Sequence, residues 1–265
     1  MQTVEMGGRA VSRFILGSNP FSGFGHQGSE RDAEMVHYYT CARIKEVLYQ
    51  AEDLGINTVL GRADRHIIRV LLEYWDEGGQ LQWFAQTCPE LGAPEPTISR
   101  AAGAGAAACY IHGGYADHLM VNGRSEELRA PVAHARDRGI PVGLAGHLPE
   151  TFRWAEDNLD MDFYMCSYYN PSSRRREAAH RSQKGEQYRE KDRQAMIECI
   201  QGLSRPAIHY KVLAAGRNEP QEALQVAAEA MRPGDAVCVG IFSKDNPDML
   251  REDVEILEQA LDSRR

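Results

Sequence analysis

The stretch AAACYIHGGYADH, residues 106–118, decides how the chain is interpreted. It opens with small apolar residues that run to Ile111, a pattern typical of a buried strand. His112 follows directly, and two glycines come next. A buried strand that ends on an imidazole is typical of a site at the carboxyl end of a strand, and glycines there would let the backbone pass close to a ligand.

Strand-like and amphipathic helical runs alternate on both sides of this stretch. The expected strands are RFILGSN, INTVLG, LQWFAQT, ACYIHGG, PVGLAGH, DFYMCSYYN, AIHYKVLAAG and AVCVGIF. Helical spacing is expected over 43–54, 66–75, 127–137, 150–158, 189–203, 219–231 and 248–261, and the segment after the third strand, APEPTISRAAGAG, has the weakest helical pattern.

Eight strand–helix repeats in 265 residues predict a (β/α)8 TIM barrel, an α/β fold, as one domain over residues 1–265. A doubly wound open sheet is the structural alternative. It fits less well because the first strand is not followed by the glycine-rich turn of that fold.

Composition excludes several classes of protein. The net charge of −8 argues against a general nucleic-acid binder and against a membrane-surface protein, because both need an excess of cations. The chain has no apolar run long enough to span a bilayer, and its first residues lack the apolar region of a signal peptide. The six cysteines are scattered without a CxxC pair, which indicates reduced thiols and a cytoplasmic location.

Two long excursions follow predicted strands, Pro20 to Tyr39 after the first and Pro171 to Arg189 after the sixth. The second is strongly basic within an acidic protein. It is interpreted either as a solvated loop or as a lid that closes on an anionic small-molecule substrate.

The predicted strand ends carry many polar side chains. In a barrel these residues share one cavity, and they are Asn19, Arg62, Asp64, Gln86, His112, His147, Cys166, Tyr168, His209, Lys211, Ser243 and Lys244. We expect His112, His147 and His209 to act as acid–base groups or as ligands of a divalent metal. His112, His147 and Cys166 are the predicted metal ligands, although no metal-binding motif with regular spacing is present.

The remaining catalytic predictions concern polarising and orienting groups. Lys211 and Tyr168 would polarise a carbonyl or hydroxyl, while Arg62 and Asp64 would orient the substrate. Lys211 lies in the apolar run IHYKVLAAGR, so it is expected to be paired or to have a shifted pKa. It is interpreted as a Schiff-base nucleophile, as a general base, or as the ion-pair partner of Asp64.

The turns AAGRNEP and FSKDNPD follow the last two predicted strands. Backbone N–H groups at helix starts beside cationic side chains suit a phosphate, although the second turn also fits a simple helix cap. The predicted cofactor-binding residues are Gly216, Arg217, Ser243, Lys244 and Asn246.

Six segments, in order, resemble the aldo-keto reductase superfamily. They are VEMGGRAVSRFILGSNPFSG, LGINTVLGRAD, CYIHGG, VGLAGHLPETF, MCSYYNPSSR and VGIFSKDNPDMLREDVEIL, and they cover nearly the full length. The resemblance implies a barrel whose amino-terminal end is closed by a β-hairpin and whose last two loops bind a phosphate. It also implies that His112 corresponds to the catalytic histidine of the family.

The other catalytic residues of that family are missing. Its aspartate falls on Leu60, its tyrosine near Arg65 and its lysine near Gln86. The residues that hold the nicotinamide are replaced by Ala145, Gly146 and Cys166. The sequence therefore does not predict a standard NADPH-dependent reductase.

Three function classes stay open. The first is an enzyme that performs metal-assisted or His/Lys acid–base chemistry, as an isomerase, lyase or hydrolase, on a small polar, carbohydrate-like substrate. The second is an NAD(P)H-dependent oxidoreductase with a rearranged site. The third is a non-catalytic binding protein on a barrel scaffold. The fold alone does not choose among them.

Overall fold

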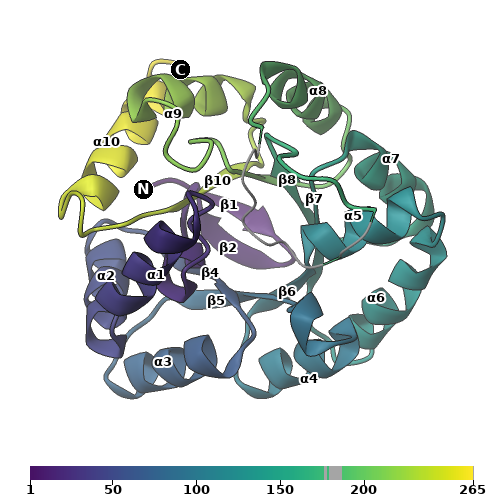
Figure 1. Ribbon diagram of the computed structural model, residues 1–265, viewed down its shortest axis with the longest axis horizontal. Coiled ribbons are helices and arrows are strands. Elements are labelled where there is room, and N and C mark those ends of the chain that lie inside the picture. Colours follow the sequence, from purple (N-terminus) through teal and green to yellow (C-terminus); the bar gives the residue numbers. More distant parts are fainter. Residues whose placement is uncertain (176–177, 179–186, 265) are drawn as a thin grey trace.

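Eight parallel strands close into a barrel, and helices surround it (Figure 1). The computed structural model describes residues 1–175, 178 and 187–264. The barrel strands are β3 (Phe14–Gly17), β4 (Thr58–Arg62), β5 (Gln82–Gln86), β6 (Ala108–Ile111), β7 (Val142–Gly146), β8 (Phe163–Ser167), β9 (Ala207–Tyr210) and β10 (Ala236–Gly240). β10 pairs with both β9 and β3, which closes the ring and confirms the predicted fold.

The predicted helices are present, each with ends within two residues of expectation. They are α2 (Cys41–Asp53), α3 (Arg65–Asp76), α6 (Arg129–Arg136), α7 (Pro149–Asn158), α8 (Glu190–Gln201), α9 (Pro220–Ala230) and α10 (Met249–Asp262). The weakly patterned segment after the third barrel strand forms α4 (Pro94–Gly103). Side-chain caps fix some of the starts: the Ile67 N–H donates to the Asp64 carboxylate over 3.0 Å at the start of α3.

Two helices were not predicted. The first excursion contains α1 (Ser29–Tyr38), and α5 (Gly113–Val121) begins directly after His112. α5 opens with two glycines, whose helix propensity is low, so its sequence does not resemble a helix start. It nevertheless forms because its buried face packs on β7.

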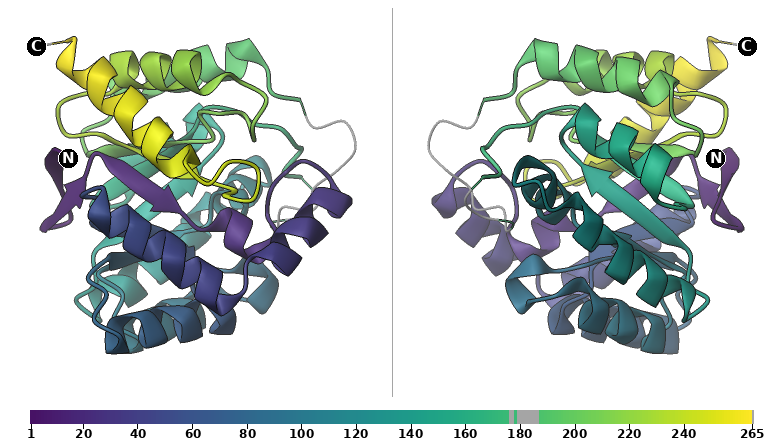
Figure 2. Two further views of the ribbon diagram at one scale, coloured as in Figure 1. Left: turned by 90° about the vertical axis from the view of Figure 1, so that its left-hand side faces the viewer. Right: turned by 90° about the vertical axis from the view of Figure 1, so that its right-hand side faces the viewer.

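A β-hairpin closes the amino-terminal end of the barrel. β1 (Thr3–Met6) and β2 (Arg9–Ser12) pair antiparallel across Gly7 and Gly8. Both glycines have positive φ, +57° and +72°, as a tight two-residue hairpin turn requires. Met6 and Val11 pack into the side chains that fill the barrel, and Figure 2 shows the hairpin at the opposite end from α1. The predicted hairpin is confirmed.

The barrel has a packed interior and a second apolar layer beneath the helices. The interior contains Ile15, Leu60, Phe84, Tyr110, Ala145, Phe163, Met165 and Ile208, among others. Side chains at the alternate positions point outward onto the helices. No helix within the described ranges is long and apolar enough to cross a membrane.

Candidate active site

The alternation of side chains along each strand selects which strand-end residues face the mouth of the barrel. Two residues beyond the interior side chains of β4, β5, β6, β7 and β9 lie Arg62, Gln86, His112, His147 and Tyr210. All five line a cavity of about 230 Å3, together with residues such as His26, Gly113 and Lys211. His112 and His147 therefore meet at one mouth, as the sequence indicated.

His147 is the central member of a chain of polar groups. Its Nδ1 lies 2.8 Å from Asp117 Oδ2, and its backbone N–H donates to the same oxygen over 2.9 Å. The carboxylate requires Nδ1 to carry the proton, so Nε2 faces the cavity as an acceptor. The Tyr210 hydroxyl lies 3.3 Å from that Nε2. Asp117, His147 and Tyr210 thus form an acid–base chain that ends at the cavity wall.

Burial sets the ionisation of this chain. The side chain of Asp117 is fully buried, and burial raises the pKa of its carboxyl to about 7. The Arg174 guanidinium, the Thr151 hydroxyl and backbone N–H groups oppose the rise, because each favours the carboxylate. Burial also raises the pKa of Tyr210, so its phenol stays protonated near neutral pH. The chain therefore holds a proton donor beside an imidazole acceptor.

The two glycines after His112 make room for protein groups. A Cβ on Gly113 would lie 3.1 Å from both His147 Cε1 and the Tyr210 hydroxyl. A Cβ on Gly114 would lie 2.4 Å from the carbonyl oxygen of Ala178 and 2.9 Å from His112 Cε1. The expected open backbone is present, but it accommodates neighbouring side chains and the segment after β8.

His112 is held in its neutral form. Its backbone N–H donates to Thr87 Oγ1 over 2.9 Å, and its Nδ1 is buried with no hydrogen-bond partner among the described residues. Burial lowers the pKa of His112 to about 3, with further contributions from Arg174, Arg62 and Lys211. A neutral imidazole at the cavity wall can bind a hydroxyl or carbonyl of a ligand, but it does not supply a proton at neutral pH.

Arg62 is buried and oriented by carboxylates. Its Nε donates to Asp64 Oδ2 over 3.0 Å, and Glu90 forms a second ion pair with it. The guanidinium lies over the Phe24 ring, 4.5 Å from its centroid. Asp64 orients Arg62 and caps α3, and it does not pair with Lys211 as one interpretation suggested.

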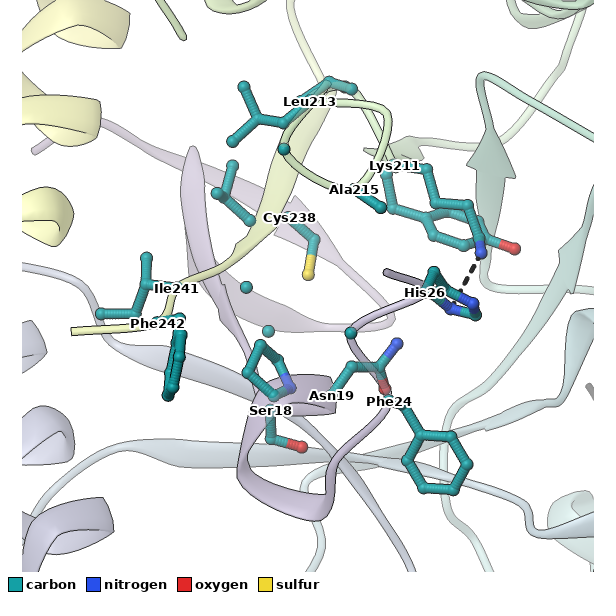
Figure 3. A pocket seen from close by; sticks show the side chains of 18 of the residues that line it. Ser18, Asn19, Phe24, His26, Lys211, Leu213, Ala215, Cys238, Ile241 and Phe242 are labelled. Atoms are coloured by element: carbon teal, nitrogen blue, oxygen red, sulfur yellow. Dashed lines mark hydrogen bonds between the residues drawn. The ribbon is translucent and has the colours of Figure 1, made fainter. Parts of the chain in front are cut away.

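Lys211 lies beyond the end of β9, not inside a strand as predicted. Its φ of +58° is left-handed, which turns the chain sharply out of the barrel. Its Nζ lies 3.1 Å from His26 Nε2, and both side chains border the cavity of about 230 Å3 and a larger one of about 400 Å3 (Figure 3). An amine therefore stands at the junction of the two cavities.

His209, Tyr168 and Cys166 have the opposite orientation and face the helix layer. Tyr168 and Cys166 belong to the apolar layer beneath the helices, and His209 is fully buried. The Tyr168 hydroxyl lies 2.9 Å from His209 Nδ1, and His209 Nε2 lies 3.3 Å from Asp235. Two histidines converge at the mouth rather than the expected three. His209, Tyr168 and Cys166 occupy the alternate strand positions, whose side chains point away from the barrel interior.

The predicted metal ligands are not brought together. His112 lines the mouth, whereas Cys166 lies behind the strand in the helix layer. In the described part of the chain, no group of three or more histidine, cysteine, aspartate and glutamate side chains is arranged to hold a metal ion.

The predicted cofactor residues lie on the loops after β9 and β10. Gly216 lines the larger cavity, whereas the side chains of the other four residues contact neighbouring protein groups. Arg217 donates to the carbonyl oxygens of Ala214 and His26. Lys244 pairs with Glu34 over 2.6 Å, Asn246 donates to Glu252, and the Ser243 hydroxyl lies 3.4 Å from the tyrosine hydroxyls of residues 38 and 39. The cationic side chains of Arg217 and Lys244 are thus engaged with protein groups, and phosphate binding by these two loops stays a prediction.

Part of the basic excursion after β8 reaches the site. Arg174 is 3 % exposed, and its Nε lies 4.0 Å from Asp117 Oδ2. Its carbonyl oxygen accepts from His118 Nδ1 on α5 over 2.7 Å. Most of the predicted lid, residues 176–177 and 179–186, lies outside the described residues.

Three site residues were missed by sequence reasoning. Asp117 lies on the unpredicted helix α5, Tyr210 was passed over for its neighbours His209 and Lys211, and His26 comes from the first excursion. Only Tyr210 carried a usable signal, since it is two residues from the interior Ile208.

The protein is a (β/α)8 barrel with an amino-terminal hairpin, and its mouth carries histidine, tyrosine and arginine side chains. No protein-family model matches the sequence, and no curated protein sequence is significantly similar to it. The likeness lies in solved structures, which share the fold at low sequence identity.

Three of these structures illustrate the likeness. A proposed aldo-keto reductase from Pseudomonas aeruginosa, PA4992, has a TM-score of 0.65 and 19 % identity, covering 98 % of this chain and 96 % of that one. A truncated 3-deoxy-D-arabino-heptulosonate 7-phosphate synthase from Thermotoga maritima has a TM-score of 0.60 and 13 % identity, covering 99 % of this chain and 92 % of that one. The aldo-keto reductase AKR11C1 from Bacillus halodurans, in its holo form, has a TM-score of 0.58 and 11 % identity, covering 97 % of this chain and 91 % of that one.

Proposed function

We propose that this protein is an enzyme that transfers protons on a small polar, hydroxyl- or carbonyl-bearing substrate, as an isomerase or lyase, without a nicotinamide cofactor. The observation that carries the proposal is the chain from Asp117 through His147 to Tyr210 at the wall of the smaller cavity. An aspartate that orients a histidine toward a hydroxyl is an arrangement suited to general acid–base catalysis.

The proton path follows from the hydrogen bonds. The Tyr210 oxygen accepts a proton from the carbon beside a substrate carbonyl as Tyr210 passes its own proton to His147 Nε2, and the electron pair of the broken C–H bond moves onto the carbonyl oxygen. The imidazolium that forms is stabilised by Asp117, 2.8 Å away. The reverse transfer returns the proton to another atom of the same substrate, so no net proton is consumed in an isomerisation.

The cationic side chains at the mouth suit the negative charge that develops on the substrate during proton transfer. Lys211 borders the same cavity and would polarise a carbonyl oxygen, and Arg62 would bind a hydroxyl or an anionic group. His112, neutral at physiological pH, would hydrogen-bond the substrate and fix its position.

Hydrogen exchange tests the proposal without knowledge of the natural substrate. The protein is incubated in D2O with dihydroxyacetone, glyceraldehyde or erythrulose, in EDTA and without NADPH, and loss of the C–H signal beside the carbonyl is followed by NMR. We expect exchange above background for at least one compound, and about a 100-fold slower rate in His147→Gln and in Tyr210→Phe.

The second tyrosine–histidine–aspartate chain supplies the matched control. Tyr168→Phe removes the hydroxyl that contacts His209 in the helix layer, so it should leave the exchange rate unchanged. Equal rates in wild type and His147→Gln would exclude the proposed chain. Turnover only with added NADPH would favour the reductase, and turnover abolished by EDTA would favour metal-assisted chemistry.

A further inference from the structure

The larger cavity lies beside the acid–base site and has a different character. Its volume is about 400 Å3, within the range of small-molecule sites. Strand ends of β3, β9 and β10 and the loops after them form its walls, and apolar side chains such as Leu213, Ile241 and Phe242 surround it (Figure 3). Pro20 and Met35 extend the apolar surface on the side of the first excursion.

One buried carboxyl group interrupts these apolar walls. Asp253 of α10 lines the cavity and is only 2 % exposed. Within the described part of the chain, its Oδ2 has no hydrogen-bond partner. A buried oxygen left without a partner costs free energy, so a carboxyl group in this position favours a ligand that donates a hydrogen bond to it.

The charged residues around this cavity favour a cation. Arg31 is neutralised by Asp245 and Glu34. Among the other titratable side chains that line the cavity, Lys211 contacts His26, and Glu219 and Asp253 are both acidic. Lys244 and Arg217, the cations expected to bind a phosphate, are engaged with Glu34 and with backbone carbonyls.

We infer that the larger cavity binds a small organic cation, an apolar body that carries one protonated amine, with the amine on Asp253 and the apolar body against Ile241 and Phe242. An ammonium–carboxylate contact in a buried site is a charge-assisted hydrogen bond, about twice as strong as a neutral one. The cavity shares Asn19, Phe24, His26, Gln86, Tyr210 and Lys211 with the acid–base site, so the cation would lie next to the reacting groups. The inference does not depend on the proposed reaction.

Three probes with the same ring test the inference. Benzylamine, benzyl alcohol and benzoate differ only in the polar group, and NADPH is added as a fourth ligand. Isothermal titration at pH 8 should show benzylamine binding about tenfold or more tightly than benzyl alcohol, with no binding of benzoate or NADPH.

Two variants locate the amine. Asp253→Asn keeps the shape of the side chain and removes its charge, so benzylamine should lose about tenfold in affinity while benzyl alcohol is unaffected. Glu255→Gln, at an exposed glutamate of the same helix, should change neither affinity. Hydrogen exchange is measured in parallel and should persist in Asp253→Asn. A loss of benzylamine affinity can therefore be distinguished from a failure of the proposed function.

Several outcomes would overturn the inference. Equal affinities for the amine and the alcohol would show a cavity that selects apolar bodies only. An unchanged benzylamine affinity in Asp253→Asn would place the amine elsewhere, and tight binding of NADPH would show a dinucleotide site. Absence of benzylamine binding to the wild-type protein would also contradict it.

Discussion

At the scale of single residues, the site depends on how burial sets protonation. His112 and Asp117 are both desolvated, but the effect has opposite consequences because their charged forms have opposite sign. The pKa of His112 falls to about 3, and that of Asp117 rises to about 7. The histidine that the sequence made most prominent is therefore a neutral binding group, while the proton-transfer role falls to His147.

These shifts predict the pH dependence of proton exchange. Protonation of Asp117 removes the acceptor that orients His147, so the rate should fall as the pH drops below about 7. His112 remains neutral over the same range and contributes no inflection. Rates measured from pH 5.5 to 9 should show an acid limb that belongs to the Asp117–His147 pair. In Asp117→Asn this limb should move to a different pH, and the rate should fall about 100-fold. An acid limb at an unchanged pH in Asp117→Asn would contradict this assignment.

Asp253 predicts a pH-dependent stability. Burial raises the pKa of its carboxyl from 3.8 to about 7, so the folded state binds this proton more tightly than the unfolded state does. Stability contributed by the protonated form is full below pH 4 and is lost as the pH rises through 7. At pH 8 and without ligand, Asp253→Asn should be more stable than wild type by roughly 2–4 kcal/mol in urea unfolding. At pH 4 the difference should vanish, and equal differences at both values would exclude the mechanism.

At the scale of elements, α5 organises the site. Its first residues, Gly113 and Gly114, follow β6 at once and leave space for His147, Tyr210 and the segment after β8. Asp117, one turn further along α5, holds His147 at the end of β7. One helix thus positions a residue of a neighbouring strand, and its unusual glycine start is the condition for that close approach.

The close approach predicts the effect of a single methyl group. In Gly113→Ala the new Cβ would crowd Gly146 N at 3.0 Å and the Tyr210 hydroxyl at 3.1 Å, so the contact between Tyr210 and His147 should lengthen. We expect the exchange rate to fall about 10- to 100-fold, with a stability change of about 1 kcal/mol. Gly103→Ala on α4 is the control, since nothing lies within 4 Å of the added Cβ, and its rate should equal that of wild type. An unaltered rate in Gly113→Ala would show that the contact tolerates displacement.

At the scale of the whole molecule, the residues that stabilise the barrel and those that line the cavities lie at opposite ends of it. The hairpin closes the amino-terminal end, and both cavities open among the loops at the carboxyl ends of the strands. Interactions between the first excursion and the last loops, including the ion pairs of Arg31 with Asp245 and of Lys244 with Glu34, join parts of the chain that are distant in sequence. Substitutions in the hairpin should therefore change folding more than chemistry.

The hairpin gives a direct test of this separation. Met6 is fully buried against the barrel interior, so Met6→Ala should lower the free energy of unfolding by about 2–5 kcal/mol. Binding and exchange by the folded fraction should stay at the wild-type level, because the side chain lies at the far end from the cavities. Urea unfolding and NMR exchange on the same sample check both statements. A large loss of exchange without a loss of stability would contradict them.

Much of this architecture was predictable from the sequence. The alternation of strands and helices, the hairpin turn at Gly7 and Gly8, and the strand ends that carry His112 and His147 follow from local patterns. Such patterns are local because side-chain periodicity and turn geometry depend on neighbouring residues. The orientation of each strand end follows the same period of two, which places His209 and Tyr168 on the side of the helices rather than in the mouth of the barrel.

Only the tertiary structure decided which groups act together. Asp117 reaches His147 across 30 positions in the chain, and His26 reaches Lys211 across 185, contacts that no local pattern encodes. Burial, which neutralises His112 and raises the pKa of Asp117 and Asp253, likewise depends on the whole packed molecule. The sequence by itself determined the barrel and the edge at which its polar residues gather, because both follow from periodicity. The protonation and pairing of those residues required the fold, because electrostatics and desolvation depend on neighbours in space.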